Sequence, residues 1–233
     1  KNCEEERLLG VSLTGIMDCE YTSGKKTGLP KLLDELREMA VKTNKEFASK
    51  IGINQSVAVT CVKPSGTVSQ LVDAASGIHA RHNPYYVRTV RGDKKDPLTK
   101  MMMDVGFPVE DDQMNPSHTS VFSFPMKVDQ RAIFRTDMSA IEQLELWLIY
   151  QKHWCEHKPS VTISVRENEW LDVGAWVYEN FDYMSGVSFL PFSEHTYKQA
   201  PYQDCTKEEY EFFVDRMPVE VEWGKLSEYE KTD

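Results

Sequence analysis

The sequence predicts an α/β fold in which mostly parallel strands are connected by helices. Short apolar runs rich in β-branched residues, at 57–62, 161–165 and 187–190, have the character of buried strands. Strong helical patterns alternate with these runs, as they do in strand–helix–strand units of a parallel sheet. With 233 residues, of which 40% are hydrophobic, the chain is long enough to bury a sizeable core.

The first predicted elements lead toward the strand at 57–62. Residues 7–17 form an apolar run with glycines at 10 and 15, which fits either a tightly packed helix or a buried strand. We expect only packing from this run and no chemistry. A long helix is then predicted from Pro30 to Gly52, because proline favours a helix start and glycine a helix end.

The stretch after that strand is the strongest candidate site. Lys63-Pro64 ends the strand, three small residues follow, and a helix is expected from Val68 to Ala75. This geometry directs backbone N–H groups and the positive end of a helix dipole at one point, where an anion such as phosphate can bind. Pro64 presets the turn and Gly66 lets a ligand approach the backbone.

The two hydroxyl residues of this turn have a second predicted role. Ser65 and Thr67 are expected to cap the following helix and to donate hydroxyl protons to a ligand. An ordinary capped helix without a ligand is the alternative interpretation. The pattern matches neither the P-loop nor the G-x-G-x-x-G dinucleotide motif.

A cationic stretch follows, in which seven basic or histidine side chains fall within 17 residues: His79, Arg81, His82, Arg88, Arg91, Lys94 and Lys95. One interpretation is a positive field that attracts a polyphosphate. The other is a surface strand at 85–91 with alternating exposed arginines. Both remain open from the sequence.

The remaining elements alternate in the same way. Predicted helices cover 97–105, 139–157, 167–180 and 207–216, and strands cover 119–125, 161–165 and 187–190. Ser139 and Glu142 form a capping box at one helix start. His153 and His157 are spaced to share a helix face, but without a third ligand we interpret them as cations near the helix end rather than as a metal site. An aromatic, polar loop is expected at 191–204.

Composition excludes several classes of protein. The net charge of −10 argues against a general nucleic-acid binder. No apolar run is long enough for a transmembrane helix, and no signal peptide is expected. The five cysteines are scattered, which indicates reduced thiols and a cytoplasmic protein. Both ends of the chain look cut, so we expect a piece of a longer protein.

Three segments carry a resemblance to a known family. Residues 62–79 (VKPSGTVSQLVDAASGIH) closely resemble the substrate-phosphate loop of ribonucleotide reductase large chains. Residues 79–91 (HARHNPYYVRTVR) and 161–165 (VTISV), with Glu169-Trp170 and 176–180 (WVYEN), are similar to the same family. The likeness is greatest to the adenosylcobalamin-dependent class of the ribonucleoside-triphosphate reductase type, and it extends through nearly the whole chain.

The resemblance implies a fold and a function. The fold is a ten-stranded α/β barrel, with residues 1–233 as the C-terminal portion of that catalytic domain. The function is reduction of the ribose 2′-hydroxyl by radical chemistry, with adenosylcobalamin as cofactor and a thioredoxin-like reductant. The implied phosphate-binding residues are Pro64, Ser65, Gly66, Thr67 and Val68. The implied partners are a ribonucleoside triphosphate and the remainder of the reductase chain, with no direct contact to nucleic acid or membrane.

Other parts of the family pattern are missing. The N-x-C-x-E motif of the radical cysteine is absent, since Lys1 stands where its asparagine would precede Cys3. The family's C-terminal cysteine pair is also absent, and Cys61 is interpreted as structural rather than as an electron donor. The catalytic residues and the cofactor site are therefore unassigned, and the isolated chain is expected to be inactive. The alternatives are a reductase class without adenosylcobalamin, a free-standing phosphate- or nucleotide-binding module, and a split-gene subunit.

Overall fold

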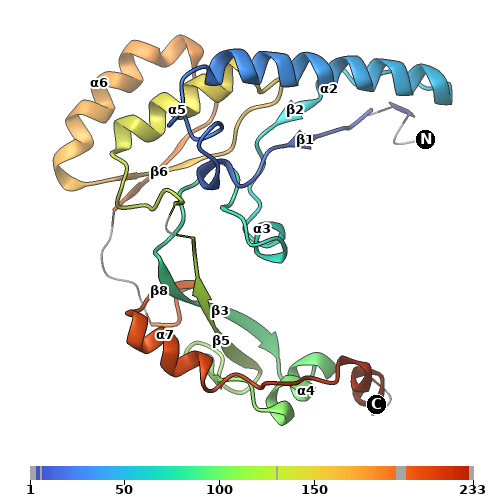
Figure 1. The fold of residues 1–233 in the computed structure, drawn as a ribbon, viewed down its shortest axis with the longest axis vertical. Helices are drawn as coiled ribbons and strands as arrows, with labels where there is room; N and C mark the ends of the chain where they lie inside the picture. The colour runs from blue at the N-terminus through green and yellow to red at the C-terminus, as the bar shows by residue number, and fades with distance from the viewer. Residues whose placement is uncertain (1–3, 6, 130, 193–197, 231–233) are drawn as a thin grey trace. The chain divides into compact units, whose positions relative to one another are not determined.

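The computed structural model describes residues 4–5, 7–129, 131–192 and 198–230. The chain forms two compact units, which Figure 1 shows as ribbons. Unit 1 comprises residues 1–81 and 130–193, and unit 2 comprises residues 82–129 and 194–233. The candidate loop at 64–68 therefore lies within unit 1.

Unit 1 begins with a strand–helix–strand arrangement. Strand β1 (Val11–Ser12) pairs in parallel with β2 (Thr60–Cys61), and the long helix α2 (Leu29–Ile51) connects them. A short 3-10 helix, η1 (Ile16–Asp18), follows β1. The helix begins after Gly28 and ends at Gly52, both in the left-handed conformation that glycine adopts readily. The predicted helix and the parallel pairing are confirmed.

A second strand–helix–strand arrangement completes unit 1. Strand β6 (Thr162–Val165) pairs in parallel with β7 (Ser188–Pro191). Between them lie α6 (Trp170–Asn180) and two flanking 3-10 helices, η2 (Glu167–Glu169) and η3 (Phe181–Tyr183). The sequence predicted the bounds of these elements to within a few residues, because their apolar runs are clear. The predicted burial of the strand at 187–190 is wrong, since β7 is mostly exposed among the described residues.

Helix α5 (Ala140–His153) lies at the centre of the core of unit 1. It starts with the predicted capping box, in which Ser139 and Glu142 bond each other's backbone amides. The side chains of Leu144, Trp147 and Tyr150 on this helix are fully buried. The core thus forms where α5 meets α2, α6 and β6.

Unit 2 is built on an antiparallel sheet. The strand order is β4 (Val109–Asp111), β5 (Thr119–Lys127), β3 (Tyr85–Asp93) and β8 (Tyr202–Asp204), and every pairing is antiparallel. The helical elements are α4 (Pro97–Val105), α7 (Lys207–Val214), η4 (Trp223–Lys225) and α8 (Leu226–Tyr229). The prediction of mostly parallel strands is wrong for this unit. Only β4 and β5 are joined by a short connection that reverses the chain, and β3 and β8 also run opposite to the strands they pair with.

The described strands do not confirm a ten-stranded barrel. They form two parallel pairs in unit 1 and one four-stranded antiparallel sheet in unit 2. The mixed α/β class is confirmed. Within the described residues, no helix is both long enough and apolar enough to cross a bilayer.

Two elements near the candidate loop are shorter than predicted. The strand expected at 57–62 is limited to β2, because the amides of Val59 and Thr60 donate to the Glu156 carboxylate at 2.9 and 3.3 Å rather than to a neighbouring strand. The helix expected from Val68 to Ala75 is only α3 (Val68–Leu71). It ends early because Asp73 has a left-handed backbone, with φ of 45°.

The shared helix face of the two histidines was predicted wrongly. Helix α5 ends at His153, so His157 lies beyond the helix. His153 Nδ1 lies 3.0 Å from Asp34 Oδ2, and His157 Nε2 lies 3.1 Å from the Ala58 carbonyl oxygen. In the part of the chain that the structure describes, no cluster of three or more His, Cys, Asp or Glu side chains is arranged to hold a metal ion.

Candidate functional site

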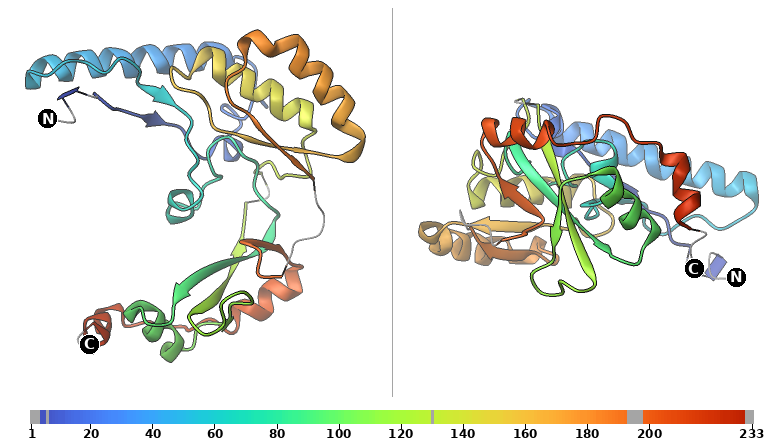
Figure 2. Two further views of the ribbon diagram at one scale, coloured as in Figure 1. Left: turned by 180° about the vertical axis from the view of Figure 1, so that it is seen from behind. Right: turned by 90° about the horizontal axis from the view of Figure 1, so that it is seen from below.

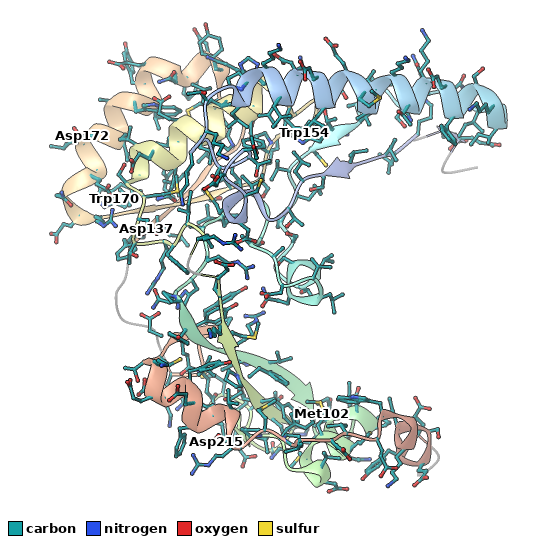
Figure 3. The ribbon with its side chains drawn as sticks, viewed as in Figure 1. Met102, Asp137, Trp154, Trp170, Asp172 and Asp215 are labelled. Atoms are coloured by element: carbon teal, nitrogen blue, oxygen red, sulfur yellow. The ribbon has the colours of Figure 1, made fainter. Side chains whose placement is uncertain are left out.

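The loop at 64–68 is held on its strand side by a buried tryptophan. Trp154, labelled in Figure 3, donates from Nε1 to the Cys61 carbonyl oxygen at 2.7 Å. The Thr60 hydroxyl donates in turn to the Trp154 carbonyl oxygen. Both residues are buried, so the end of β2 is fixed on the core just before the chain turns outward.

The turn itself is open to solvent. Pro64, Gly66, Thr67 and Val68 are exposed, and Ser65 is half-buried. The amides of Gly66, Thr67 and Val68 have no hydrogen-bond partner among the described residues. Gly66 has a negative φ, and a Cβ added to it would meet nothing within 4 Å. Neither the backbone nor the packing of this protein therefore requires glycine at this position.

The predicted capping roles are wrong. Neither Ser65 nor Thr67 makes a side-chain cap to α3. The Ser65 hydroxyl lies 2.6 Å from Thr14 Oγ1 and accepts from the Gly77 amide at 3.0 Å. Because Thr14 donates to the Ala75 carbonyl oxygen, the Ser65 proton is directed at Thr14 and away from the open side of the turn. Ser65 therefore shapes the loop, and the Thr67 hydroxyl stays on the exposed side.

Thr14 is a site residue that the sequence analysis missed. It belongs to the apolar run at 7–17, from which only packing was expected, yet it bonds both Ser65 and the Gly77 amide. The one available signal was a hydroxyl residue two positions after the end of the strand. Sequence position alone could not show that residues 51 apart would meet.

Gly77 closes the far side of the loop. Its φ is +55°, and a Cβ there would lie 3.0 Å from the Lys63 carbonyl oxygen. Both the conformation and the close approach exclude larger residues without strain. Gly77 is thus a point where the segment that enters the loop, at Lys63, and the segment that leaves it touch.

A buried arginine fixes the segment between α3 and Gly77. Arg81 is 8% exposed and donates to both carboxylate oxygens of Asp18, at 2.8 and 3.1 Å. It also donates to Asp73 Oδ1 at 3.1 Å. Asp18 accepts from the Ala75 amide at 2.7 Å. The arginine therefore joins η1 to the segment between α3 and Gly77.

Three of the other cations in the stretch at 79–95 are already compensated by neighbouring groups. In unit 2, Arg91 pairs with Asp112 at 2.7 Å, and Lys94 pairs with Asp111. Arg88 donates to the Pro201 carbonyl oxygen and lies over the ring of Tyr202. Because carboxylates and carbonyls already compensate these charges, the surface-strand interpretation is the better one.

His79 is held neutral by its surroundings. Its Nδ1 lies 3.0 Å from the Ser76 carbonyl oxygen, and its Nε2 accepts from the Thr162 amide at 3.0 Å. Burial lowers the pKa of His79, and the bond to Ser76 only partly opposes this. The residue lines a cavity of about 120 Å³, together with Arg135, Gln143 and Ser164.

We expect His79 to make the free energy of unfolding depend on pH. A histidine whose pKa is lower in the folded state binds protons more readily when unfolded, so its contribution is complete above its ordinary pKa of about 6.5 and is lost as the pH falls below it. The urea midpoint should therefore decrease between pH 7 and pH 5. The variant His79→Gln should show a shallower decrease, and an equal slope in both proteins would contradict the assignment.

The described thiols are not activated for chemistry at the loop. Cys61 is buried, and burial raises its pKa. Burial also raises the pKa of Cys155 to about 12 and that of Cys205 to about 11. Only Cys19 has a lowered pKa, through a hydrogen bond from the backbone of Thr22. All four are free thiols, as predicted, and Cys3 lies outside the described residues.

Comparisons with known proteins identify relatives of the chain. No protein-family model matches it. It is 30% identical to the adenosylcobalamin-dependent ribonucleoside-triphosphate reductase of Euglena gracilis, in a match that covers 92% of the chain and 30% of that protein. The corresponding enzyme of Lactobacillus gasseri is 28% identical, over 95% of the chain and 34% of the enzyme. The chain thus spans about a third of the length of the curated relatives it matches.

A solved structure agrees with these matches. The crystal structure of a B12-dependent (class II) ribonucleotide reductase superposes with a TM-score of 0.81 and is 25% identical in sequence. The match covers 99% of this chain and 36% of the other. The likeness therefore includes both the loop at 64–68 and the elements around it.

Proposed function

From the premise that this chain is homologous along most of its length to the adenosylcobalamin-dependent ribonucleoside-triphosphate reductases, we propose that it forms the part of such an enzyme that binds the substrate phosphates. The reaction is the reduction of a ribonucleotide to a deoxyribonucleotide. The chain is the C-terminal portion of the catalytic barrel, and it depends on the remainder of the reductase for turnover.

One observation carries the proposal. Three consecutive amides, those of Gly66, Thr67 and Val68, face solvent without partners in the described chain. Oriented amides of this kind bind the oxygens of a phosphate. The open space around Gly66 is explained if a ligand, rather than the protein, needs the close approach.

Each residue of the turn has a distinct role in this proposal. Gly66, Thr67 and Val68 donate backbone N–H groups, and Thr67 adds a hydroxyl. Pro64 and Ser65 hold the shape of the turn, Ser65 through its bonds to Thr14 and Gly77. Fixing the polyphosphate fixes the ribose that is attached to it. Positioning of this kind removes a large entropic part of the barrier to reaction.

The cofactor is proposed from the name of the relatives. Adenosylcobalamin is a large molecule with a broad corrin ring, whereas four cavities lined by described residues of unit 1 have volumes of only about 120 to 590 Å³, too small to enclose it. We therefore derive no step through the cofactor on this chain and propose that residues elsewhere in the enzyme bind it.

The electrons are also proposed to come from outside the described chain. Replacing the ribose C2′–OH by C2′–H consumes two electrons and two protons and releases water, and a dithiol supplies both as it becomes a disulfide. The raised pKa values of Cys61 and Cys155 disfavour the thiolate that such exchange needs. A thioredoxin-like reductant acting on cysteines elsewhere in the enzyme is the proposed source.

The hydroxyl of Thr67 provides the test. In the reductase polypeptide that contains this chain, Thr67→Val should weaken ribonucleoside-triphosphate binding roughly 10-fold, because one hydrogen bond to a charged phosphate is lost. Binding of the nucleoside without phosphates should not change. Equilibrium dialysis with labelled nucleotide measures both.

Thr27→Val is the matched control, since Thr27 is exposed and lies outside the loop. It should leave triphosphate binding unchanged. Equal triphosphate affinities for wild type and Thr67→Val would argue for a loop that is only structural. Equal losses for nucleoside and triphosphate would place Thr67 at another part of the substrate.

A further inference from the structure

Thr14 lies at the point where the chain changes its hydrogen-bonding partner. Just before it, the Leu13 amide donates to the Cys61 carbonyl oxygen on β2 at 3.4 Å. Just after it, the Gly15 amide donates to the Ala75 carbonyl oxygen, in the segment that follows α3, at 2.8 Å. Figures 1 and 2 show β1 beside β2, with α3 beyond the end of β2. Thr14 therefore stands between the segment that enters the loop at 64–68 and the segment that leaves it.

The hydroxyl of Thr14 bonds both of these segments. Its O–H donates to the Ala75 carbonyl oxygen at 2.9 Å. Its oxygen accepts from the Gly77 amide at 3.0 Å and from the Ser65 hydroxyl, whose oxygen lies 2.6 Å away. A hydroxyl has one proton and two lone pairs, so these three bonds use all of its capacity. The Thr14 hydroxyl therefore acts on the loop and has no hydrogen bond left for a ligand.

Ser65 transmits this constraint into the turn. Its hydroxyl donates to Thr14 and accepts from the Gly77 amide at 3.0 Å. Its amide donates to Ser76 Oγ at 3.3 Å, and its carbonyl oxygen accepts from the Ser69 amide of α3 at 2.7 Å. Every polar group of Ser65 is thus bonded. The backbone of the turn has a fixed direction at this residue, and the three open amides follow directly after it.

The loss of the Thr14 hydroxyl would release this arrangement. Valine has nearly the shape of threonine but no hydroxyl. In Thr14→Val the Ser65 proton loses its acceptor, and the Ala75 carbonyl oxygen loses a donor. The Ser65 side chain can then rotate toward the open side of the turn. A group that must be immobilised when the ligand binds subtracts from the affinity, so a looser turn binds phosphate less tightly.

We propose that Thr14 is a positioning residue of the phosphate site, and that its hydroxyl acts through Ser65 to hold the amides at 66–68 in the orientation that binds phosphate. This rests on the proposed function. Thr14 itself contacts neither the phosphate nor the ribose. Its hydroxyl orders the turn before the ligand arrives, so that the cost of ordering the turn is not subtracted from the binding free energy.

Nucleotide binding to the reductase polypeptide that contains this chain tests the proposal. Thr14→Val should weaken ribonucleoside-triphosphate binding roughly 10-fold and leave binding of the nucleoside without phosphates unchanged. Thr14→Ser keeps the hydroxyl and should restore the wild-type affinity. Thr27→Val is the matched control, because Thr27 is exposed and lies outside the loop, and it should bind as wild type does. Equal affinities for wild type and Thr14→Val, or an equal loss in Thr14→Ser, would overturn the proposal.

A double-mutant cycle shows whether Thr14 acts through Ser65. Ser65→Ala removes the same link from its other end, so Thr14→Val combined with Ser65→Ala should weaken triphosphate binding by clearly less than the product of the two single losses. Thr14→Val combined with Thr67→Val should give about the full product, since Thr67 is proposed to contact the phosphate directly. A full product in the first pair would overturn the route through Ser65.

Amide exchange separates this inference from the proposed function. In the reductase polypeptide without nucleotide, the peptide that contains Gly77 should exchange faster in Thr14→Val than in wild type or Thr14→Ser, because the Gly77 amide loses one of its two acceptors. Weaker triphosphate binding in Thr67→Val with unchanged binding in Thr14→Val would reject the positioning role alone. Unchanged binding in both variants, with faster exchange in Thr14→Val, would reject the phosphate role of the loop and the positioning role with it.

Discussion

Gly66→Val is expected to lower the affinity of the reductase for ribonucleoside triphosphates roughly 100-fold, which is about 2.7 kcal/mol. In the proposed site, the added side chain would occupy the space through which a phosphate reaches the amides of Gly66, Thr67 and Val68. The fold should tolerate the change, because φ at Gly66 is negative and a Cβ meets nothing within 4 Å. Isothermal titration with a ribonucleoside triphosphate measures the loss, and the thermal midpoint should stay within a few degrees of wild type.

Gly224→Val is the matched control for this experiment. A Cβ at Gly224 also meets nothing within 4 Å, and its φ is not in the left-handed region. It lies in η4 of unit 2, outside the candidate loop. Triphosphate affinity should be unchanged in this variant. If Gly66→Val bound triphosphates as well as the control did, the phosphate-binding role of the loop would be rejected.

Arg81→Met is expected to destabilise unit 1 by about 2–3 kcal/mol, because it removes a buried guanidinium and its charged hydrogen bonds to Asp18 and Asp73. Asp18 loses two hydrogen bonds at 2.8 and 3.1 Å, and Asp73 loses one. The segment between α3 and Gly77 also loses its link to η1. Urea denaturation followed by tryptophan fluorescence measures the effect, since Trp147 and Trp154 lie in the core of the same unit.

Two further variants show whether the burial of the Arg81 charge is responsible for the loss of stability in Arg81→Met. Arg37→Met removes an ion pair to Asp34 at 3.1 Å in which both side chains are about one-third exposed, and it should cost less than about 1 kcal/mol. Arg81→Lys keeps the charge but loses the bidentate geometry. Its loss of stability should therefore lie between those of Arg37→Met and Arg81→Met. A similar small cost for Arg81→Met and Arg37→Met would contradict the role given to Arg81.

Local signals determined the elements that the sequence predicted well. Helix α2 follows from an apolar repeat bounded by Pro30 and Gly52, and the start of α5 follows from Ser139 and Glu142. The parallel pair β6–β7 follows from two predicted strands separated by a helix, whereas the run that contains β1 was left open between a helix and a strand. These features depend on residues close together in the chain. The family resemblance also depends on residues close together in the chain, because it rests on contiguous motifs.

Tertiary structure decided the contacts around the loop. The sequence indicated a turn at 64–68 but assigned Ser65 and Thr67 as caps of α3, because local capping is the ordinary use of such hydroxyls. In the fold, Ser65 meets Thr14 instead, and Asp73 ends the helix after four residues. Arg81, which the sequence placed in a cationic stretch, is buried between two carboxylates.

The sequence by itself therefore indicated the stretch that we propose as the phosphate site, since a strand, a turn of small residues and a helix start are all local properties. Only the tertiary structure decided which groups of that stretch are free to do so. A hydroxyl or an amide is available to a ligand only if no distant residue has already bonded it. Thr14, Ser76 and Gly77 bond the polar groups of Ser65 and leave the amides of Gly66, Thr67 and Val68 open.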